Sequence, residues 1–229
     1  MNYLQIIKVL VVLLFLIIVL SHRIRKPNFI HIPKNAGSFI EELGLKNGYY
    51  WGKYHTDMQK KNKHELCSKW HIPYRQMKKN TRNHYSGSNF CIIRSPYDRI
   101  VSEYKYVNRS NKNNLSKDNL NKFVHSLPDK IKKDKNAQDC HLLPQTEYIY
   151  DENGNQICNY IIDFENLERD IYNLNMNENL GMTNVDFKKE NDTSFSTLSR
   201  ADLDKKSIEI INDIYKKDFE FLKKNNYSL

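Results

Sequence analysis

Short apolar runs alternate with helical patterns along most of the chain. The runs at 28–32 (Asn-Phe-Ile-His-Ile) and 90–93 (Phe-Cys-Ile-Ile) are rich in β-prone residues, which is typical of buried strands. A turn and a helical pattern follow each run, and a third strand near 160–164 precedes a helix over 165–174. Strands that alternate with helices predict an α/β fold in which a parallel central sheet is flanked by helices.

Capping residues indicate where the helices begin. Ser38 is expected to open the first helix, and Ser95 is expected to cap the second, which has proline at its first position. The last helix is predicted over 201–221. The polar, Asn-rich stretch 108–121 predicts a surface insertion.

The N-terminus carries an apolar run, 3–20, which is long enough to be a candidate membrane span at about 1.5 Å per residue. We therefore predict two parts, a membrane anchor with a basic flank at 1–26 and one globular domain at 27–229. The alternative is a signal peptide that is cleaved near Ser21.

Two signals disagree about the orientation of the globular domain. The bases Arg23, Arg25 and Lys26 follow the apolar run and favour a cytosolic domain by the positive-inside rule. Sequons for N-glycosylation favour a lumenal domain instead. These sequons begin at Asn108, Asn114, Asn191 and Asn226. These signals alone leave the orientation open.

The positive charge is concentrated in one part of the chain. The net charge is +9, and the stretch 46–82 holds ten bases against two acids, a net charge of +8. A focused basic stretch raises the local concentration of anionic ligands, although a solvated lysine-rich surface is the alternative reading. We therefore expect an anionic partner. We do not expect this partner to be a nucleic acid, and the sequence does not indicate an oligomeric state.

The four cysteines have no C-x-x-C spacing, so no zinc site or other metal is expected. Cys91 lies inside an apolar run and is predicted to be a buried free thiol. Cys140 and Cys158 flank a segment that could fold back as a hairpin. A disulfide between these two is plausible if the domain is lumenal.

The segment 31–38 (His-Ile-Pro-Lys-Asn-Ala-Gly-Ser) is a candidate phosphate-binding turn. A strand that leads through a Gly-containing turn into a helix presents unpaired backbone N–H groups and a helix dipole, which both favour anions. Lys34 adds an ammonium group and Ser38 a hydroxyl. The alternative is an ordinary turn, and the missing G-x-x-x-x-G-K-[ST] motif disfavours a nucleotide triphosphatase.

A second motif, 93–102 (Ile-Arg-Ser-Pro-Tyr-Asp-Arg-Ile-Val-Ser), follows the second strand. Together the two motifs resemble the sulfotransferase superfamily and are similar to the Golgi carbohydrate sulfotransferases that act on heparan, chondroitin and dermatan. Their signatures read HIPKTxGTS and RNPYDRLVSxY. Asn35 and Ser38 stand where the first signature has threonine, and Ser95 stands for asparagine in the second. A looser likeness covers 164–167 and 215–219.

The resemblance implies a P-loop-like sulfotransferase fold and the sulfate donor 3′-phosphoadenosine 5′-phosphosulfate (PAPS). By position, the residues that would hold the donor are Lys34, Asn35, Ala36, Gly37 and Ser38 at the 5′-phosphosulfate, and Arg94 and Ser102 at the 3′-phosphate. An arginine at a strand end offers a bidentate fork for phosphate. We assign Ser95 and Asp98 to capping and Arg99 to a surface ion pair. The segment 191–194 is a weaker candidate for a nucleotide contact.

Sulfuryl transfer needs an in-line acceptor, a stabilised leaving group and a general base. Lys34 suits the bridging oxygen between phosphate and sulfate. The resembling family has a catalytic histidine upstream of the second motif, and His71 lies 23 residues before Arg94, so His71 is our candidate base. A core histidine beside Trp70 is the alternative, and His141 is the second candidate for contact with the acceptor.

The sequence therefore predicts a single-pass membrane protein of the secretory pathway or Golgi, with a lumenal catalytic domain that sulfates an anionic glycan. One alternative is a catalytically inactive, membrane-tethered module that binds a nucleotide or a glycan. Another is a kinase-like phosphotransferase, although no magnesium-binding carboxylates stand near Lys34 in the sequence.

Overall fold

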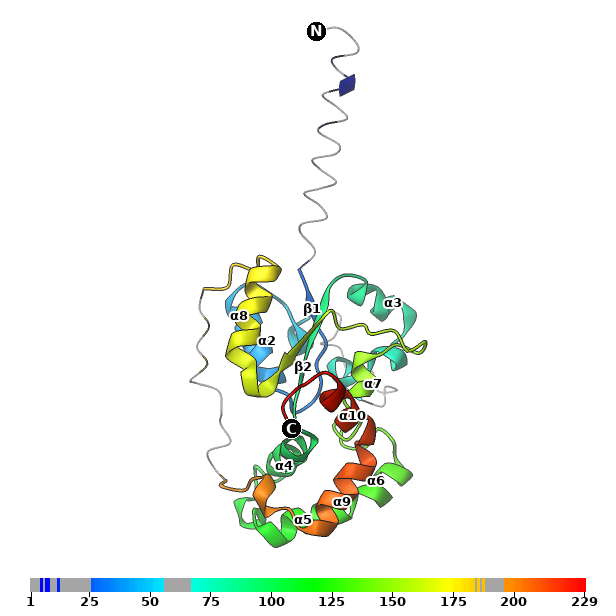
Figure 1. Ribbon diagram of the computed structural model, residues 1–229, viewed down its shortest axis with the longest axis vertical. Helices are drawn as coiled ribbons and strands as arrows, with labels where there is room; N and C mark the ends of the chain where they lie inside the picture. Colours follow the sequence, from blue (N-terminus) through cyan, green and yellow to red (C-terminus); the bar gives the residue numbers. More distant parts are fainter. Residues whose placement is uncertain are drawn as a thin grey trace.

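A parallel three-stranded sheet in the order β1-β2-β3 forms the centre of the molecule (Figure 1). The computed structural model describes residues 5, 7, 8, 12, 26–55, 67–183, 185, 187 and 196–229. The strands are β1 (Asn28–Phe29), β2 (Asn89–Ile93) and β3 (Tyr160–Asp163). Both strand pairs are parallel, which confirms the predicted α/β fold with its helix-flanked parallel sheet.

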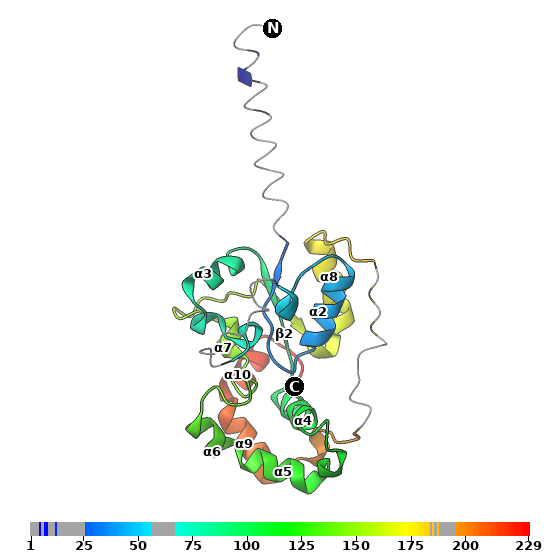
Figure 2. The same ribbon diagram turned by 180° about the vertical axis from the view of Figure 1, so that it is seen from behind.

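Helices cover both faces of this sheet, because successive residues of a buried strand point to opposite sides. In β2, Phe90 and Ile92 belong to the core under one pair of helices, and Cys91 and Ile93 belong to the core under the other. The helices are α2 (Gly37–Lys46) and α8 (Leu167–Asn177) on the first face, and α7 (Thr146–Ile149) and α10 (Lys216–Lys224) on the second (Figures 1 and 2).

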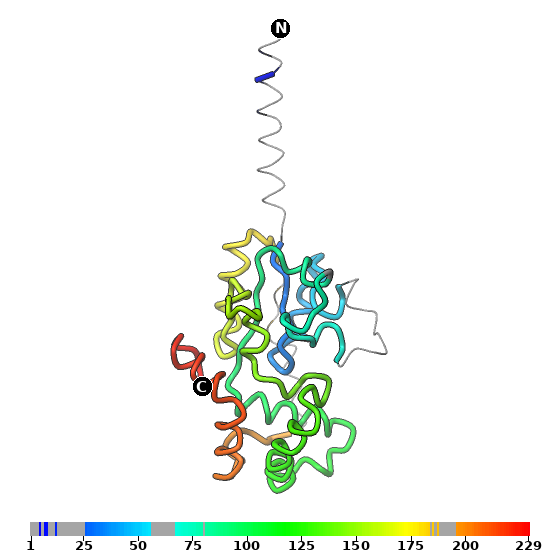
Figure 3. The backbone as a smooth tube through the Cα atoms, turned by 90° about the vertical axis from the view of Figure 1, so that its right-hand side faces the viewer, coloured from blue at the N-terminus to red at the C-terminus, as the bar shows by residue number. Residues whose placement is uncertain are grey.

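A separate cluster of helices lies below the carboxyl ends of the strands (Figures 1 and 3). It consists of α4 (Pro96–Val107), α5 (Lys117–His125), α6 (Leu127–Lys133) and α9 (Lys205–Ile214). Leu120 and Val124 of α5 are fully buried in its core. The prediction that 108–121 is a surface insertion is thus wrong at its C-terminal end, where Leu120 anchors an amphipathic helix.

Short helices connect these layers. They are η1 (Gly52–Tyr54), η2 (Lys69–His71), η3 (Tyr74–Gln76), α3 (Lys79–Arg82), η4 (Asn83–Tyr85), η5 (Lys112–Asn114), η6 (Phe164–Asn166) and η7 (Arg200–Asp202). The single helix predicted over 201–221 is instead divided among η7, α9 and α10. The break between α9 and α10 lies at two buried side chains that bond to another segment. The Tyr215 hydroxyl donates to the Leu142 carbonyl, and the Asp218 carboxylate accepts from the Gln145 backbone N–H.

Two helix starts in the structure differ in detail from those that the sequence predicts. The first helix begins at Gly37, one residue before Ser38, and its N-cap Ala36 has a left-handed backbone. Ser95 occupies the N-cap position of α4, but its side chain makes no capping hydrogen bond.

The predicted membrane anchor, 1–26, lies outside the described residues except at Gln5, Ile7, Lys8, Val12 and Lys26. Among the described residues, no helix combines the length and apolar character that a bilayer crossing requires.

Candidate active site

A cavity of about 740 Å³ opens at the carboxyl ends of the strands, where ligands bind in open α/β sheets. The turns after β1, β2 and β3 all contribute to its wall. Its lining includes Lys34, Ala36, Gly37, Ser38, Lys53, Trp70, His71, Arg94, Ser102, Tyr106, Asp139, His141 and Phe164. Among the described residues, every candidate for catalysis or donor binding that the sequence predicts, except Asn35, lies on this cavity.

The turn after β1 is shaped as a cradle for an anion. Lys34 and Ala36 have positive φ angles of 69° and 58°, although neither is glycine. Such left-handed residues cost about 1–2 kcal/mol each and persist only where other contacts hold them. The turn leads directly into the N-terminus of α2, whose first backbone N–H groups have no partner within the helix.

Asn35 is predicted to contact the phosphosulfate, but its side chain points away from the cavity. It is fully buried, and its amide donates to the Ile92 carbonyl at 2.8 Å and to Gln145 Oε1 at 2.6 Å. The side-chain amide therefore ties the turn to β2, and the assignment of Asn35 to the phosphosulfate loop stays a prediction.

Gly37 is needed because of a close neighbour. A Cβ atom at this position would lie 2.1 Å from His31 Nε2, so any side chain would displace the imidazole. His31 is fixed in turn by a contact of 2.8 Å between its Nδ1 and Glu41 Oε1. The Lys53 amide donates to the same carboxylate at 2.9 Å. The first turn of α2 thus fits only glycine at its start.

Arg94 and Ser102 approach the cavity from the second motif, as predicted. The Arg94 guanidinium lies 4.0 Å from the centre of the Phe164 ring, and its Nη1 donates to the Lys34 carbonyl at 3.3 Å. Its Nε is buried and has no hydrogen-bond partner among the described residues. Burial lowers the pKa of Arg94 from its ordinary value, because the charged guanidinium is partly removed from water. A bound phosphate would stabilise this charge.

Arg99 was expected on the surface, but it is buried. Its Nε donates to the Pro33 carbonyl at 3.0 Å and its Nη2 to the His141 carbonyl at 2.7 Å. The surface prediction is wrong, because this side chain connects the first turn to the segment that carries His141.

Lys34 is the cation most affected by its surroundings. Burial lowers its pKa from 10.5 to about 8, and the nearby Glu103 carboxylate opposes this shift. Its ammonium lies 4.0 Å from the centre of the Tyr106 ring. A half-buried ammonium beside a turn that opens a helix is suited to stabilising negative charge that develops on a leaving group.

His71 is buried on the opposite wall, in η2. Its Nδ1 lies 2.8 Å from Asp139 Oδ2. Burial lowers the pKa of His71 from its ordinary value, although Asp139 opposes the shift, so the ring is neutral near pH 7. Because an ionised carboxylate can only accept, Nδ1 carries the proton and Nε2 is the nitrogen able to accept another.

His141 forms a second pair of the same kind, with Nδ1 2.7 Å from Glu103 Oε2. The ring centres of His71 and His141 are 4.7 Å apart, and those of His31 and His71 are 4.8 Å apart. Three imidazoles therefore stand in a row, and a carboxylate holds each one. Burial lowers the pKa of His141 as well, so this ring is also neutral near pH 7.

The carboxylates and one amide of the site were missed at the sequence level. Asp139 has no motif around it, and Gln145 lies in an unremarkable helix start. Glu103 and Tyr106 could have been found, because they follow Arg99 by four and seven residues and share its helix face. The segment 191–194, predicted as a weaker nucleotide contact, lies outside the described residues.

The predicted Cys140–Cys158 disulfide is wrong. Cys140 is bonded to Cys67, and Cys158 is a buried thiol next to the thiol of Cys91. The chain does fold back between Tyr150 and Gln156, but Cys158 then lies next to Cys91 of β2, and Cys140 pairs with Cys67. The prediction that Cys91 is a buried free thiol is confirmed.

The only group of described residues with metal-binding potential is His71, Asp139 and His141, whose ligand atoms lie within 4.8 Å of one another. Zinc ligands at about 2.0–2.1 Å in a tetrahedron stand about 3.4 Å apart. The Asp139 carboxylate is already engaged by His71 and Ser68. The group therefore fits a hydrogen-bonded pair better than a metal centre.

Comparison with known proteins supports one family. A profile described as the sulfotransferase family matches residues 21–227. No curated protein and no solved structure matches the chain significantly. The matched range includes both strand-turn-helix motifs and every residue of the cavity wall named above. The chain belongs to the sulfotransferase family.

Proposed function

We propose that this sulfotransferase moves a sulfuryl group from PAPS to a hydroxyl of a glycan, with His71 as general base and Lys34 stabilising the leaving group. The observation that carries the proposal is that one cavity is lined by a strand-to-helix turn with a half-buried lysine and by a neutral histidine held by a carboxylate. Sulfotransferases generally use PAPS as the sulfate donor, which supports this choice of substrate.

The donor end of the cavity consists of the 34–38 turn with Arg94 and Ser102. The residues there fit a nucleotide with two phosphate groups, because the turn and the Arg94 guanidinium offer separate sites for anions. The Arg94 Nε, which has no partner among the described residues, supports a ligand that supplies an acceptor oxygen.

The acceptor end consists of His71, Asp139 and His141. Here the acceptor hydroxyl gives its proton to His71 Nε2 while its oxygen forms the new bond to sulfur. The bond from sulfur to the phosphate oxygen breaks, and the Lys34 ammonium stabilises the charge left on that oxygen. Neither residue needs to change its protonation state before reaction near pH 7, since His71 is neutral there and Lys34, with a pKa of about 8, is mainly charged.

An anionic glycan is the acceptor that the charges favour. Lys53 and Trp70 line the cavity beside His71, and both belong to the basic stretch 46–82. The part of this stretch at 56–66 lies outside the described residues. Replacing Lys60, Lys61 and Lys63 by Glu should raise the acceptor KM and weaken its dependence on salt. The same change at the exposed Lys216 and Lys217 of α10 is the control.

A lumenal domain behind an N-terminal membrane anchor, in the secretory pathway or Golgi, is the location that we propose. The Cys67–Cys140 disulfide supports it, because disulfides persist in oxidising compartments. The sequon residue Asn114 is exposed and could carry a glycan there. Expression in secretory cells should give a glycosidase-sensitive protein that loses mass when Asn114 is replaced by Gln; an unmodified protein at all sequons would contradict a lumenal domain.

The decisive experiment measures transfer of labelled sulfate from PAPS to a panel of glycans that differ in uronate and sulfate content. We expect the purified protein to label an anionic member of the panel. Transfer only to a non-carbohydrate hydroxyl would refute the glycan acceptor but not the sulfotransferase chemistry. Tight binding of the desulfated donor without any turnover would favour an inactive binding module instead.

A further inference from the structure

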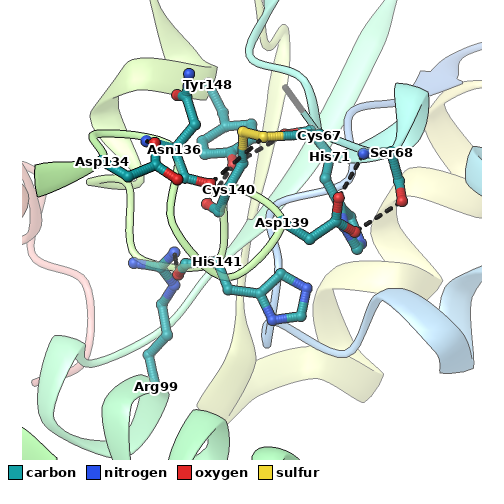
Figure 4. The surroundings of a disulfide bond; sticks show 10 residues. All are labelled: Cys67, Ser68, His71, Arg99, Asp134, Asn136, Asp139, Cys140, His141 and Tyr148. Atoms are coloured by element: carbon teal, nitrogen blue, oxygen red, sulfur yellow. Dashed lines mark hydrogen bonds and ion pairs between the residues drawn. A yellow bond between two sulfur atoms is a disulfide. The ribbon is translucent and has the colours of Figure 1, made fainter. Parts of the chain in front are cut away.

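The disulfide joins the two segments that form the His71–Asp139 pair. Cys67 immediately precedes Ser68 in the segment that leads to His71, and Cys140 immediately follows Asp139. The paired cysteines are separated by 73 residues in sequence, and both are buried. Figure 4 shows the sulfur bridge above the Asp139 side chain, whose carboxylate points toward Ser68 and His71.

Asp139 is held entirely by the other segment. Its carboxylate accepts from the Ser68 amide at 2.5 Å and from the Ser68 hydroxyl at 2.7 Å, and it contacts His71 Nδ1 at 2.8 Å (Figure 4). Burial alone would raise the pKa of Asp139, but these three contacts hold it well below its usual range. The carboxylate is therefore ionised and fixes the imidazole tautomer that leaves Nε2 able to accept a proton.

The backbone around Asp139 does not favour this position by itself. Gln138, Asp139 and Cys140 have consecutive positive φ angles of 56°, 60° and 68°. Residues other than glycine avoid this region, so three in succession require external restraint. Hydrogen bonds from Ser68 to Asp139 and the covalent bond between Cys67 and Cys140 restrain this turn, and the Tyr148 hydroxyl adds a hydrogen bond to the Cys140 carbonyl at 3.0 Å.

We propose that the Cys67–Cys140 disulfide and Asp139 together position His71 for proton abstraction, so that full activity requires the oxidised protein. This inference rests on the proposed function, in which His71 is the base. A dithiol would reverse the arrangement by attacking the bridge: the S–S bond breaks, two cysteine thiols form, and the dithiol closes to its own disulfide. Without the bridge, the strained turn relaxes and the carboxylate leaves His71.

Kinetics of the full chain test the proposal. Reduction with dithiothreitol should lower kcat by about 10- to 100-fold, as expected when a base loses its orientation. The KM for PAPS and the affinity for the desulfated donor should change less than about twofold, because Asn35 and Gln145 hold the donor turn against β2 without the bridge. The variant Asp139→Asn should show the same fall in kcat as the reduced wild type. The control Asp151→Asn removes a carboxylate outside the cavity and should keep the wild-type kcat.

The effects of reduction and of Asp139→Asn on kcat should not multiply. If the disulfide acts through Asp139, reduction of Asp139→Asn should cause little further loss. An equal loss in wild type and in Asp139→Asn would overturn the proposal, and so would undiminished kcat after reduction. A parallel loss of donor affinity or of the thermal transition would show that the bridge supports the whole domain, which would also overturn it.

A spectroscopic measurement separates this proposal from the proposed function. Nitrogen NMR of ¹⁵N-histidine-labelled protein should show His71 as the Nδ1–H tautomer when oxidised, and as a mixture of tautomers after reduction or in Asp139→Asn. This result would support the positioning role even if no glycan were sulfated. An unchanged His71 tautomer in both cases would refute the role even in an active enzyme.

Discussion

The donor end of the cavity is built from two short stretches of consecutive residues, whereas the acceptor end is assembled from segments that lie far apart. Lys34 to Ser38 and Arg94 to Ser102 each follow directly from a strand of the parallel sheet. His71 and Asp139, by contrast, are brought together across 68 residues by hydrogen bonds and a disulfide.

The donor end and the acceptor end thus hold their functional groups in place by different means. At the donor end, the parallel sheet itself puts both turns at one edge, so strand pairing sets their distance. At the acceptor end, no strand pairing in the described part of the chain joins the segments, so hydrogen-bonded carboxylates orient the imidazoles. We therefore expect substitutions at the acceptor end to affect kcat more, and those at the donor end to affect donor affinity as well.

The largest effect is expected at the base. Replacing His71 by Ala should lower kcat by about 10²- to 10⁴-fold, because no other group takes up the acceptor proton in the same position. The desulfated donor should still bind, which calorimetry can measure. His125→Ala is the matched control, since His125 also pairs with a carboxylate, Asp204, at 3.2 Å but lies outside the cavity. Activity above a tenth of wild type in His71→Ala would contradict the proposed base.

The next largest effect is expected at the leaving group. Lys34→Ala should lower kcat by about 10²- to 10³-fold and also weaken binding of the donor, since the ammonium acts on both. The exposed Lys122 of α5 offers a control substitution to Ala, with kinetics like those of wild type. Loss of donor affinity without loss of kcat would show that Lys34 only binds the donor.

The two ends should also differ in their pH dependence. Burial lowers the pKa of His71 below its ordinary value of 6.5. Activity should therefore fall on the acid side of pH 6.5, where His71 becomes protonated. Deprotonation of Lys34, whose pKa is about 8, should reduce kcat/KM for the donor above that pH. A rate profile with both limbs is expected, and Lys34→Arg should shift only the alkaline limb upward. An unchanged alkaline limb in this variant would assign it to another group.

The smallest effect is expected at Gly37. A methyl group there must displace the His31 ring, 2.1 Å away, so Gly37→Ala should destabilise the fold by about 1–3 kcal/mol and weaken donor binding. Thermal unfolding and calorimetry can measure both. Ser38→Ala, at the exposed next position, should leave the stability within about 0.5 kcal/mol of wild type. Equal stability of the two variants would mean that the His31 ring moves without cost.

The sequence predicted the sheet and the first helices, because those depend on local patterns. The residues it assigned to the donor, except Asn35, line one cavity, and their role in donor binding stays a prediction. Apolar runs such as 90–93 have few alternatives to a buried strand, and a helix must begin where Pro96 permits it. The structural role of the Asn35 side chain was not predicted, because its amide donates to β2, a contact between distant segments that leaves no local signal.

The rest could not be predicted, because it depends on contacts between distant segments. Nothing near Cys67 indicates Cys140 as its partner, and Cys158 was the nearer choice along the chain. Arg99 follows an exposed-looking pattern, yet the two carbonyls that it satisfies belong to loops that meet only in the folded protein. The His71–Asp139 pair likewise has no local signal, although His71 itself could be chosen by its place before the second motif.

Gln145 connects the two donor turns through a single amide group. Its Oε1 accepts from Asn35 Nδ2 and from the Arg94 backbone amide, and its Nε2 donates to the Arg94 carbonyl. The two turns must therefore shift as one rigid unit if they shift at all. If the proposed donor binds these turns, differences in ligand size would have to be accommodated by other parts of the cavity wall, such as Phe164 and Phe187.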